Sequence, residues 1–219
     1  MSLIENRVEA GKLLARALKT VSKDAIVLAV PRGGVVVGFE VARALDLQLD
    51  VIVTKKIGAP DNPELAIGAV AEDGTFFVDE DLVNRLYVSK GYISEEVERQ
   101  RLEIQRRLVR YRGNVPYPSL KNREVIVVDD GVATGSTLKA ALRLVRSKGA
   151  KTVTVAVPVG PSDTIRELKT LADQVICLLT PEPFYAIGQF YVDFSQTSDE
   201  EVTELLKRSR HEQPKKVAS

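Results

Sequence analysis

The sequence contains few of the residues that nucleophilic and metal chemistry most often use. Its one cysteine, Cys177, lies in an apolar run, which argues against a disulfide framework and fits a reducing compartment. Its one histidine, His211, lies in a polar stretch that we assign to a C-terminal tail over residues 206–219. Because that stretch is far from every predicted strand end, we expect neither Ser-His or Cys-His catalysis nor a His/Cys zinc site.

A strong net charge and long apolar segments are also lacking. The chain has 31 Lys and Arg against 30 Asp and Glu, a net charge of +1, so bulk attraction gives no reason to expect a nucleic-acid partner. It has no run of about 18 apolar residues and no apolar leader segment, so we expect a soluble, cytoplasmic protein without a membrane partner. The length of 219 residues fits a single domain, which we place at residues 1–205.

What the sequence does contain is a regular alternation of strands and helices. Short apolar runs predict strands at residues 26–30, 49–54, 125–128, 152–157 and 175–179. Helical patterns lie between them at residues 34–45, 137–148 and 163–171. An opening helix is predicted by apolar and small residues at helical spacing, namely Ile4, Val8, Gly11, Ala15 and Leu18. The alternation predicts a three-layer α/β fold with a mainly parallel central sheet and helices on both faces.

Two segments interrupt this alternation. The region of about residues 57–80 contains Pro60, Pro63 and a turn at residues 72–74, which predicts a hairpin or lid. A long charged helix is predicted over about residues 94–112. Its arginines suggest either a nucleic-acid patch or an ion-paired face that is solvated or contacts another subunit. The interleaved glutamates favour the ion-paired face or subunit contact.

The segment VIVVDDGVATGST, residues 125–137, carries the clearest chemical signal. A buried strand ends in Asp129 and Asp130, and a turn with two glycines and three hydroxyl groups leads into a helix. Glycines let backbone amides approach an anion, and a helix start presents free N–H groups. Neighbouring carboxylates can accept hydrogen bonds from a vicinal diol. Two carboxylates followed by an anion-binding turn therefore suit a ribose 5-phosphate. The alternative is a plain structural turn, in which Ser136 is only the N-cap of the next helix.

This segment resembles the phosphoribosyl-pyrophosphate signature of type I phosphoribosyltransferases. The resemblance implies that Asp129 and Asp130 hold the ribose hydroxyls. It implies that the 5-phosphate is bound by the turn, that is by Gly131, Val132, Ala133, Thr134, Gly135, Ser136 and Thr137. It also implies Mg²⁺ bound together with phosphoribosyl pyrophosphate, with no direct protein ligand, although Asp129 or Asp130 can contact the ion through water. Homodimerisation is a further expectation from the family.

A second glycine-rich turn, Pro31-Arg32-Gly33-Gly34, follows the first predicted strand and opens a helix. The resemblance assigns Arg32, Gly33 and Gly34 to the departing pyrophosphate and implies a non-proline cis peptide in this turn. The alternative is a tight turn that needs glycine for backbone reasons alone. At the end of the next predicted strand, either Lys55 or Lys56 is expected to face the site and balance phosphate charge, and the pattern does not choose between them.

A small hood is expected at about residues 180–195, after the last strand. By the resemblance, a hood of this kind holds the acceptor base, and Phe184 and Tyr185 are the candidates for that contact. The alternative is that these aromatic side chains pack the hood onto the sheet. The motifs PRGG, VTKKIGAP and PEPFYAIGQFY together are similar to a group of phosphoribosyltransferases whose base specificity is unassigned.

The resemblance implies an enzyme that moves the 5-phosphoribosyl group from phosphoribosyl pyrophosphate to a purine or pyrimidine base and releases pyrophosphate. One alternative is a non-catalytic sensor of phosphoribosyl pyrophosphate or a nucleotide that contacts nucleic acid through the arginine-rich helix. Another is a nucleotide-binding phosphotransferase or hydrolase, against which stands the lack of a P-loop lysine in GVATGST. The sequence does not specify the acceptor base.

Overall fold

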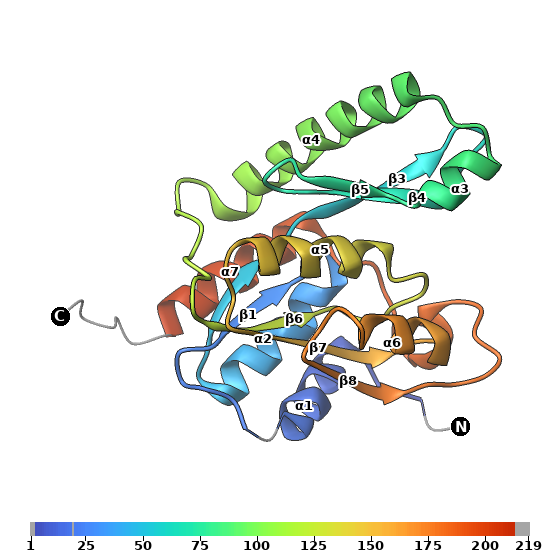
Figure 1. Ribbon diagram of the computed structural model, residues 1–219. Coiled ribbons are helices and arrows are strands. Elements are labelled where there is room, and N and C mark those ends of the chain that lie inside the picture. The colour runs from blue at the N-terminus through green and yellow to red at the C-terminus, as the bar shows by residue number, and fades with distance from the viewer. Residues whose placement is uncertain (1–2, 19, 213–219) are drawn as a thin grey trace.

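A parallel sheet forms the centre of the lower lobe in Figure 1, which shows the computed structural model of the chain. The structure describes residues 3–18 and 20–212. The five strands have the order β2-β1-β6-β7-β8, and each neighbouring pair is parallel. Their bounds are β1 Ile26–Ala29, β2 Gln48–Val51, β6 Glu124–Val128, β7 Thr152–Val159 and β8 Gln174–Leu179. The predicted α/β fold with a parallel central sheet is confirmed.

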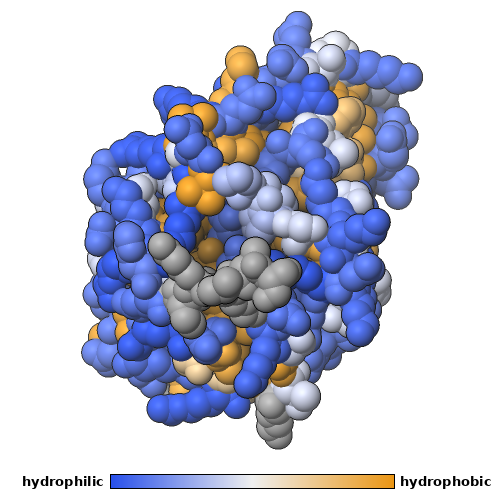
Figure 2. Space-filling model, turned by 90° about the vertical axis from the view of Figure 1, so that its left-hand side faces the viewer, coloured by the Kyte–Doolittle hydropathy of each residue, from blue (hydrophilic) through white to orange (hydrophobic). Residues whose placement is uncertain are grey.

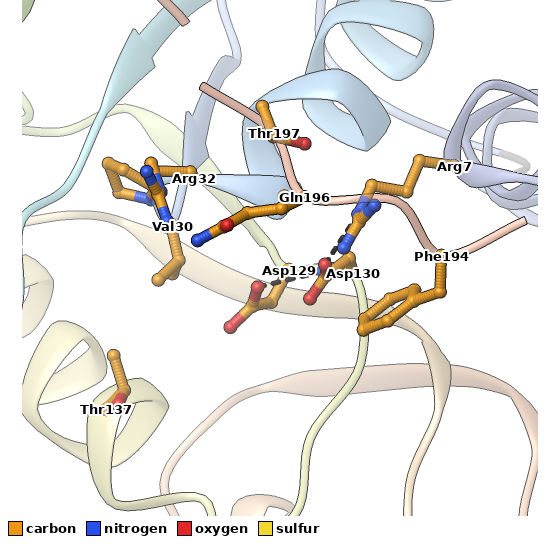
Figure 3. Close-up of a pocket in the computed structure, with 11 residues that line it drawn as sticks. Arg7, Val30, Arg32, Asp129, Asp130, Thr137, Phe194, Gln196 and Thr197 are labelled. Carbon is orange, nitrogen blue, oxygen red and sulfur yellow. Dashed lines mark hydrogen bonds and ion pairs between the residues drawn. The ribbon is translucent and has the colours of Figure 1, made fainter. Parts of the chain in front are cut away.

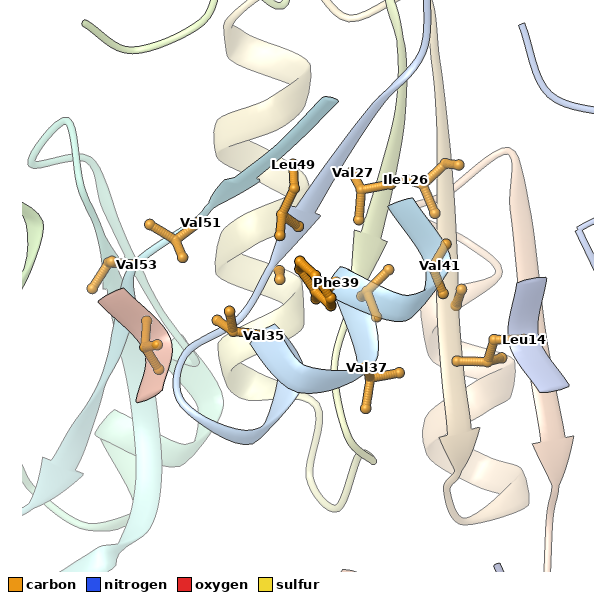
Figure 4. Packing of buried hydrophobic residues seen from close by; sticks show 14 of the residues in the cluster. Leu14, Val27, Val35, Val37, Phe39, Val41, Leu49, Val51, Val53 and Ile126 are labelled. Atoms are coloured by element: carbon orange, nitrogen blue, oxygen red, sulfur yellow. The ribbon is translucent and has the colours of Figure 1, made fainter. Parts of the chain in front are cut away.

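Helices cover both faces of this sheet, which gives three layers (Figure 1). Successive side chains of a strand point to opposite faces of the sheet, so each strand contributes to two separate buried clusters. Val27 and Ala29 of β1 lie in one buried cluster, and Ile26 and Leu28 lie in another. The first cluster includes residues of α1 (Arg7–Ala17), α2 (Gly33–Leu45) and α7 (Asp199–Glu212), and Figure 4 shows part of it. The second includes residues of α5 (Ser136–Ser147) and α6 (Ser162–Leu168).

Residues 54–112 form an upper lobe that stands on the lower one (Figure 1). It contains an antiparallel sheet of β3 (Thr54–Ala59), β4 (Asn62–Ala71) and β5 (Phe76–Val78), followed by α3 (Glu80–Arg85) and the long α4 (Lys90–Arg112). The predicted hairpin is thus part of a three-stranded sheet. Seen from the side, the surface is mostly hydrophilic, and the apolar areas are interrupted by polar ones (Figure 2).

Several element boundaries differ from the sequence predictions, and two of them matter for the site and the upper lobe. The predicted strand at residues 49–54 ends at Val51, and Thr54 already begins β3 in the other sheet. An apolar run cannot reveal this change of sheet, because Ile52 and Val53 between the strands are buried too. The long helix begins at Lys90 rather than Ser94, since the Ser89 hydroxyl accepts a hydrogen bond from the Tyr92 amide at 3.2 Å and caps it.

At the two ends of the chain, burial departs from the predicted pattern. In α1, Val8 is 37% exposed, while Ala10 and Leu14 are fully buried. Helix α7 continues to Glu212 and buries Leu206 and Ser209, so the tail boundary predicted at residue 205 falls inside a helix. Residues 213–219 of the predicted tail lie outside the described residues.

Within the described parts of the chain, no helix combines the length and the apolar character needed to cross a membrane.

The arginines of α4 that the sequence presented as a possible nucleic-acid patch have acidic partners. The nitrogen-to-oxygen distances are 2.7 Å for Arg99–Glu96, 3.4 Å for Arg101–Glu98, 2.7 Å for Arg106–Glu103, 2.9 Å for Arg107–Glu103, 2.7 Å for Arg110–Asp199 and 2.9 Å for Arg112–Asp50. This helix therefore presents an ion-paired face, as the interleaved glutamates indicated.

A buried ionic network joins the upper lobe to the lower one. The guanidinium of Arg112 donates from Nε to Asp50 in β2 at 2.9 Å, and its Nη2 lies 3.5 Å from Glu72, which follows β4. It also stacks over the Tyr117 ring at 4.3 Å from the centroid. Burial is the main reason why the pKa of Glu72 is raised, and Arg112 opposes that rise. Because Arg112 and Asp50 are almost fully buried, each depends on the other for charge compensation.

We expect Arg112→Met to lower the free energy of unfolding by about 3–5 kcal/mol, because it leaves two buried acids without their cation. Urea denaturation followed by circular dichroism measures this. The matched control is Arg106→Met, which removes a pair on a side chain that is 78% exposed. That change should stay within about 0.5 kcal/mol of the parent protein. Equal stability of the two variants would show that the network does not hold the lobes together.

Candidate active site

The order of the strands locates the site. From β1 the chain passes through α2 to β2 on one side, and from β6 it passes through α5 to β7 on the other side. Strands β1 and β6 are neighbours, so their carboxyl ends form the point at which the strand order reverses. Ligands of open α/β sheets bind in the crevice at such a point. Here the two turns bring Arg32 and Gly33 next to Asp129 and Asp130.

Two cavities lie at this crevice. The first has a volume of about 380 Å³ and is lined by Arg7, Val30, Pro31, Arg32, Gly33, Asp129, Asp130, Thr137, Phe194, Gln196 and Thr197 (Figure 3). The second has a volume of about 210 Å³ and is lined by residues 129–138 together with Ile187. Because the cavities share Asp129, Asp130 and Thr137, they form two compartments of one site. The structure thus brings together the two glycine-rich turns that the sequence singled out.

The turn after β6 has a backbone shape that requires glycine at two positions. Gly131 has φ of +157°, and a Cβ there would lie 2.4 Å from Cγ2 of Ile187. Gly135 has φ of +75° and is the N-cap of α5, so Ser136 is the first residue of the helix and not its cap. No side chain caps this helix start. The Thr164 hydroxyl donates to the Ala133 carbonyl at 2.7 Å and fixes the turn from outside.

The two aspartates point toward the first cavity (Figure 3). The Asp130 amide donates to Oδ1 of Asp129 at 2.8 Å, and Oδ2 of Asp130 accepts from Nε of Arg7 at 2.7 Å. The Tyr191 hydroxyl donates to the Asp130 carbonyl at 2.7 Å. Burial and the neighbouring Asp130 carboxylate raise the pKa of Asp129 well above its ordinary value. The two acids are therefore held differently: Asp130 is paired with Arg7, and Asp129 accepts from the Asp130 amide.

The turn after β1 comes close enough to touch these acids. Its Pro31–Arg32 peptide bond is cis, so the non-proline cis bond implied by the family resemblance is present. Helix α2 begins at Gly33, where a Cβ would lie 1.9 Å from Oδ2 of Asp130. At Gly34 a Cβ would lie 2.9 Å from the Asp129 Cα. Both glycines are therefore required by the close approach of the two turns.

Lys55 and Lys56 lie within β3 and not at the end of a parallel strand, because β2 has already ended at Val51. Neither is among the residues that line the two cavities. Nζ of Lys55 lies 4.0 Å from Glu103. Burial lowers the pKa of Lys55, and the positive charges of Arg107 and Arg32 lower it further. Lys55 is thus close enough to Arg32 of the site for the two positive charges to interact.

Phe184 and Tyr185, the two hood residues predicted to contact the base, line neither cavity. Phe184 packs against Phe190 with ring centroids 5.1 Å apart and against the buried cluster that contains Val27 of β1, which fits the packing alternative. Tyr185 is 83% exposed. The hood contains a short 3₁₀ helix, Ile187–Phe190, whose Ile187 contributes to the second cavity. Whether Phe184 or Tyr185 contacts an acceptor base stays a prediction.

Several lining residues were missed by the sequence analysis, above all Arg7. Its helix was interpreted as packing only, and no motif marks the residue. Phe194 was also missed, although it lies inside the predicted hood, and so were Gln196 and Thr197, which lie between the hood and the final helix. Arg7 reaches the site because the Ile4 amide donates to the Phe190 carbonyl at 2.9 Å, and a contact so distant in sequence leaves no local signal.

Comparison with known proteins identifies the family. A model of the phosphoribosyl transferase domain matches residues 4–195. This chain belongs to the phosphoribosyl transferase family. Two Mycobacterium tuberculosis proteins, each named "Putative phosphoribosyl transferase", are 43% identical to it over 213 residues. The match covers 97% of this chain and 48% of each relative, so the chain spans about half the length of these curated relatives.

A solved structure supports the same conclusion for the fold. The crystal structure of a Thermus thermophilus protein is 42% identical and has a TM-score of 0.82. The match covers 95% of this chain and 99% of that protein. This phosphoribosyl transferase domain therefore has a relative of known structure over nearly its whole length.

The raised pKa of Asp129 leads to a prediction about stability and pH. An acid with a raised pKa in the folded state favours folding below its unfolded pKa of about 3.9, and that contribution is lost as the pH rises through the folded pKa. Asp129→Asn cannot ionise and retains the acceptor oxygen for the Asp130 amide. We therefore expect its unfolding free energy, relative to the parent, to increase with pH from about pH 4 upward, by up to about 1.4 kcal/mol per pH unit.

Urea titrations of the parent and the variant between about pH 4 and pH 8 measure this difference. The control is Asp163→Asn, which changes an acid whose side chain is 83% exposed. Its difference from the parent should stay nearly constant. A constant difference for Asp129→Asn as well would mean that Asp129 is not held in its protonated form by the fold.

Proposed function

We propose that this protein is an enzyme that transfers the 5-phosphoribosyl group of phosphoribosyl pyrophosphate to a nitrogenous base and releases pyrophosphate. The observation that carries the proposal is the meeting of two anion-binding turns and an aspartate pair at one crevice. The turns come from the neighbouring strands β1 and β6, and the pair lies between them. A donor with a phosphate at one end, a diol in the middle and a pyrophosphate at the other end matches this order.

Each part of the donor has a place in the proposal. Asp129 and Asp130 accept hydrogen bonds from the ribose 2- and 3-hydroxyls, and the turn at residues 131–137 binds the 5-phosphate at the start of α5. Arg32, Gly33 and Gly34 stabilise the pyrophosphate at the start of α2 as negative charge develops on it. With both ends fixed, C1 of the ribose is held in position for attack by the base, and its configuration inverts.

The acids of the site fit a Mg²⁺ ion that enters with the donor. Among residues 3–18 and 20–212, no group of three metal-ligating side chains occurs. At the first cavity the acids are Asp129 and Asp130, and one oxygen of Asp130 is bound by Arg7. Mg²⁺ typically keeps several waters and combines one or two carboxylates with substrate phosphates, so contact through water suits this pair. When bound, the ion neutralises charge on the pyrophosphate oxygens.

The upper lobe is proposed to exclude water from the reacting carbon. It is connected to the phosphate-binding turn directly, because the Thr54 hydroxyl at the start of β3 donates to the Thr137 carbonyl at 3.1 Å. An enclosed site protects an electron-poor ribose carbon from attack by water. Lys55, in the same strand, is proposed to balance pyrophosphate charge. We include in the proposal a homodimeric, cytoplasmic enzyme of nucleotide salvage, which rests on the resemblance to the family.

The alternative of a nucleic-acid-contacting sensor lacks a supporting observation in the structure. Its motivation was the arginine-rich helix, and the six arginines considered there are paired with acids. The glycine-rich turn after β6 contains no lysine, which leaves the phosphotransferase alternative without a P-loop.

The first test is calorimetric binding of phosphoribosyl pyrophosphate in the presence of Mg²⁺. We expect binding by the parent protein and a loss of at least about 100-fold in affinity for Asp129→Asn combined with Asp130→Asn, since two charge-assisted hydrogen bonds weaken. Asp163→Asn serves as the control and should bind like the parent. Unchanged affinity of the double variant would refute the assignment of the acids.

The second part of the test measures turnover. The protein is incubated with donor, Mg²⁺ and a panel of purine and pyrimidine bases, and pyrophosphate release and nucleotide products are followed. One base should give stoichiometric nucleotide and pyrophosphate. Intact donor binding with no product from any base would contradict the transferase proposal and favour a sensor.

A further inference from the structure

The feature that the proposed mechanism does not use is Arg7, the first residue of α1. Its side chain enters the first cavity beside Asp130 (Figure 3). The two side chains are 11% and 14% exposed, so the ion pair is close to fully buried. A buried ion pair is costly to form unless its geometry is good and its other hydrogen-bonding groups are satisfied. The contacts of Arg7 therefore decide whether the pair is only structural or serves the site.

The guanidinium of Arg7 is fixed by three contacts. Its Nε donates to Oδ2 of Asp130 at 2.7 Å, and its Nη1 donates to the Ser195 carbonyl at 2.6 Å. The plane lies over the Phe194 ring at 3.9 Å from the centroid, and that ring packs in turn against Tyr191 at 5.0 Å. A planar guanidinium that is stacked and doubly hydrogen-bonded has little freedom to rotate.

The backbone around Arg7 is equally constrained. The segment before α1 pairs with the hood, because the Val192 amide donates to the Ile4 carbonyl and the Asp193 amide donates to the Glu5 carbonyl, each at 2.9 Å. The Asn6 side chain then caps the helix by accepting from the Glu9 amide at 3.0 Å. Arg7 thus enters the site from the start of α1, directly after the segment that is hydrogen-bonded to the hood.

The turn after β1 closes the remaining side of this arrangement. A Cβ on Gly33 would lie 2.5 Å from Nε of Arg7 and 1.9 Å from Oδ2 of Asp130. The Arg7–Asp130 contact is therefore enclosed by the turn that is proposed to hold pyrophosphate. One oxygen of Asp130 is directed by Arg7, which leaves the orientation of the carboxylate set before any ligand arrives.

We propose that Arg7 is a positioning residue, which orients the Asp130 carboxylate toward the ribose hydroxyls of the donor. This inference rests on the proposed function. It separates the roles of the two acids: Asp130 is oriented by a cation from α1, while Asp129 is oriented by the Asp130 amide. Arg7 also supplies positive charge beside two adjacent carboxyl groups, which would otherwise repel each other in a buried site.

The opposite role for Arg7 is that of a competitor that occupies Asp130 and must leave before a ribose can bind. The two roles predict opposite effects of removing the guanidinium. A positioning residue increases affinity for ribose-containing ligands, and a competitor decreases it. A purely structural role would change the binding of every ligand of the site in parallel with stability.

The experiment measures the dissociation constants of ribose 5-phosphate and of pyrophosphate, each with Mg²⁺, by calorimetry. The variants are Arg7→Gln, Arg7→Lys and the control Arg16→Gln, which changes an exposed arginine of the same helix. We expect Arg7→Gln to weaken ribose 5-phosphate binding by at least about tenfold and pyrophosphate binding by no more than about twofold. Arg7→Lys retains the positive charge but lacks the planar guanidinium that donates two hydrogen bonds and stacks on Phe194. Its loss of affinity for ribose 5-phosphate should therefore be intermediate.

Equal or tighter binding of ribose 5-phosphate by Arg7→Gln would overturn the inference, and so would parallel losses for both ligands. If Arg7→Gln does not fold, the ratio of the two losses in Arg7→Lys decides in the same way. Failure of the parent protein to bind any ribose phosphate would instead refute the proposed function, and the inference with it. The comparison of variants begins only after the parent has bound, so the two failures are distinguishable.

Discussion

The turns that follow β1 and β6 approach each other so closely that a single methyl group does not fit between them. A Cβ at Gly33 would overlap the Asp130 carboxylate, and a Cβ at Gly34 would overlap the backbone of Asp129. The rest of the site depends on this approach. It brings the start of α2 and the start of α5 to one crevice, with the aspartate pair between them. A crevice with helix starts on both sides is suited to a ligand that is anionic at both ends.

Charge balance is the second constraint on this site. Adjacent carboxylates in a buried position repel each other, and two features of the structure reduce this repulsion. Arg7 pairs with Asp130, and the pKa of Asp129 is raised by burial and by its neighbour. The raised pKa of Asp129 and the pairing of Asp130 with Arg7 both reduce the repulsion between the two groups.

Much of this arrangement could be predicted from the sequence, because its signals are local. The alternation of apolar runs predicted the parallel sheet, and the residues DDGVATGST predicted where the acids and the turn would lie. What could not be predicted depends on contacts between distant segments. The apolar run at residues 49–54 gave no sign that the chain changes sheets after Val51. Arg7 reaches Asp130 across 123 positions through a backbone pairing with the hood, and no local pattern encodes such a contact.

The most direct measurement of the central claim is a crystal structure of the protein with ribose 5-phosphate bound. The account predicts the 2- and 3-hydroxyls within hydrogen-bonding distance of Asp129 and Asp130, and the phosphate against the amides of residues 131–137. It also predicts that the Arg7–Asp130 contact persists in that complex. A phosphate bound at another place, or a ribose whose hydroxyls face away from both aspartates, would contradict it.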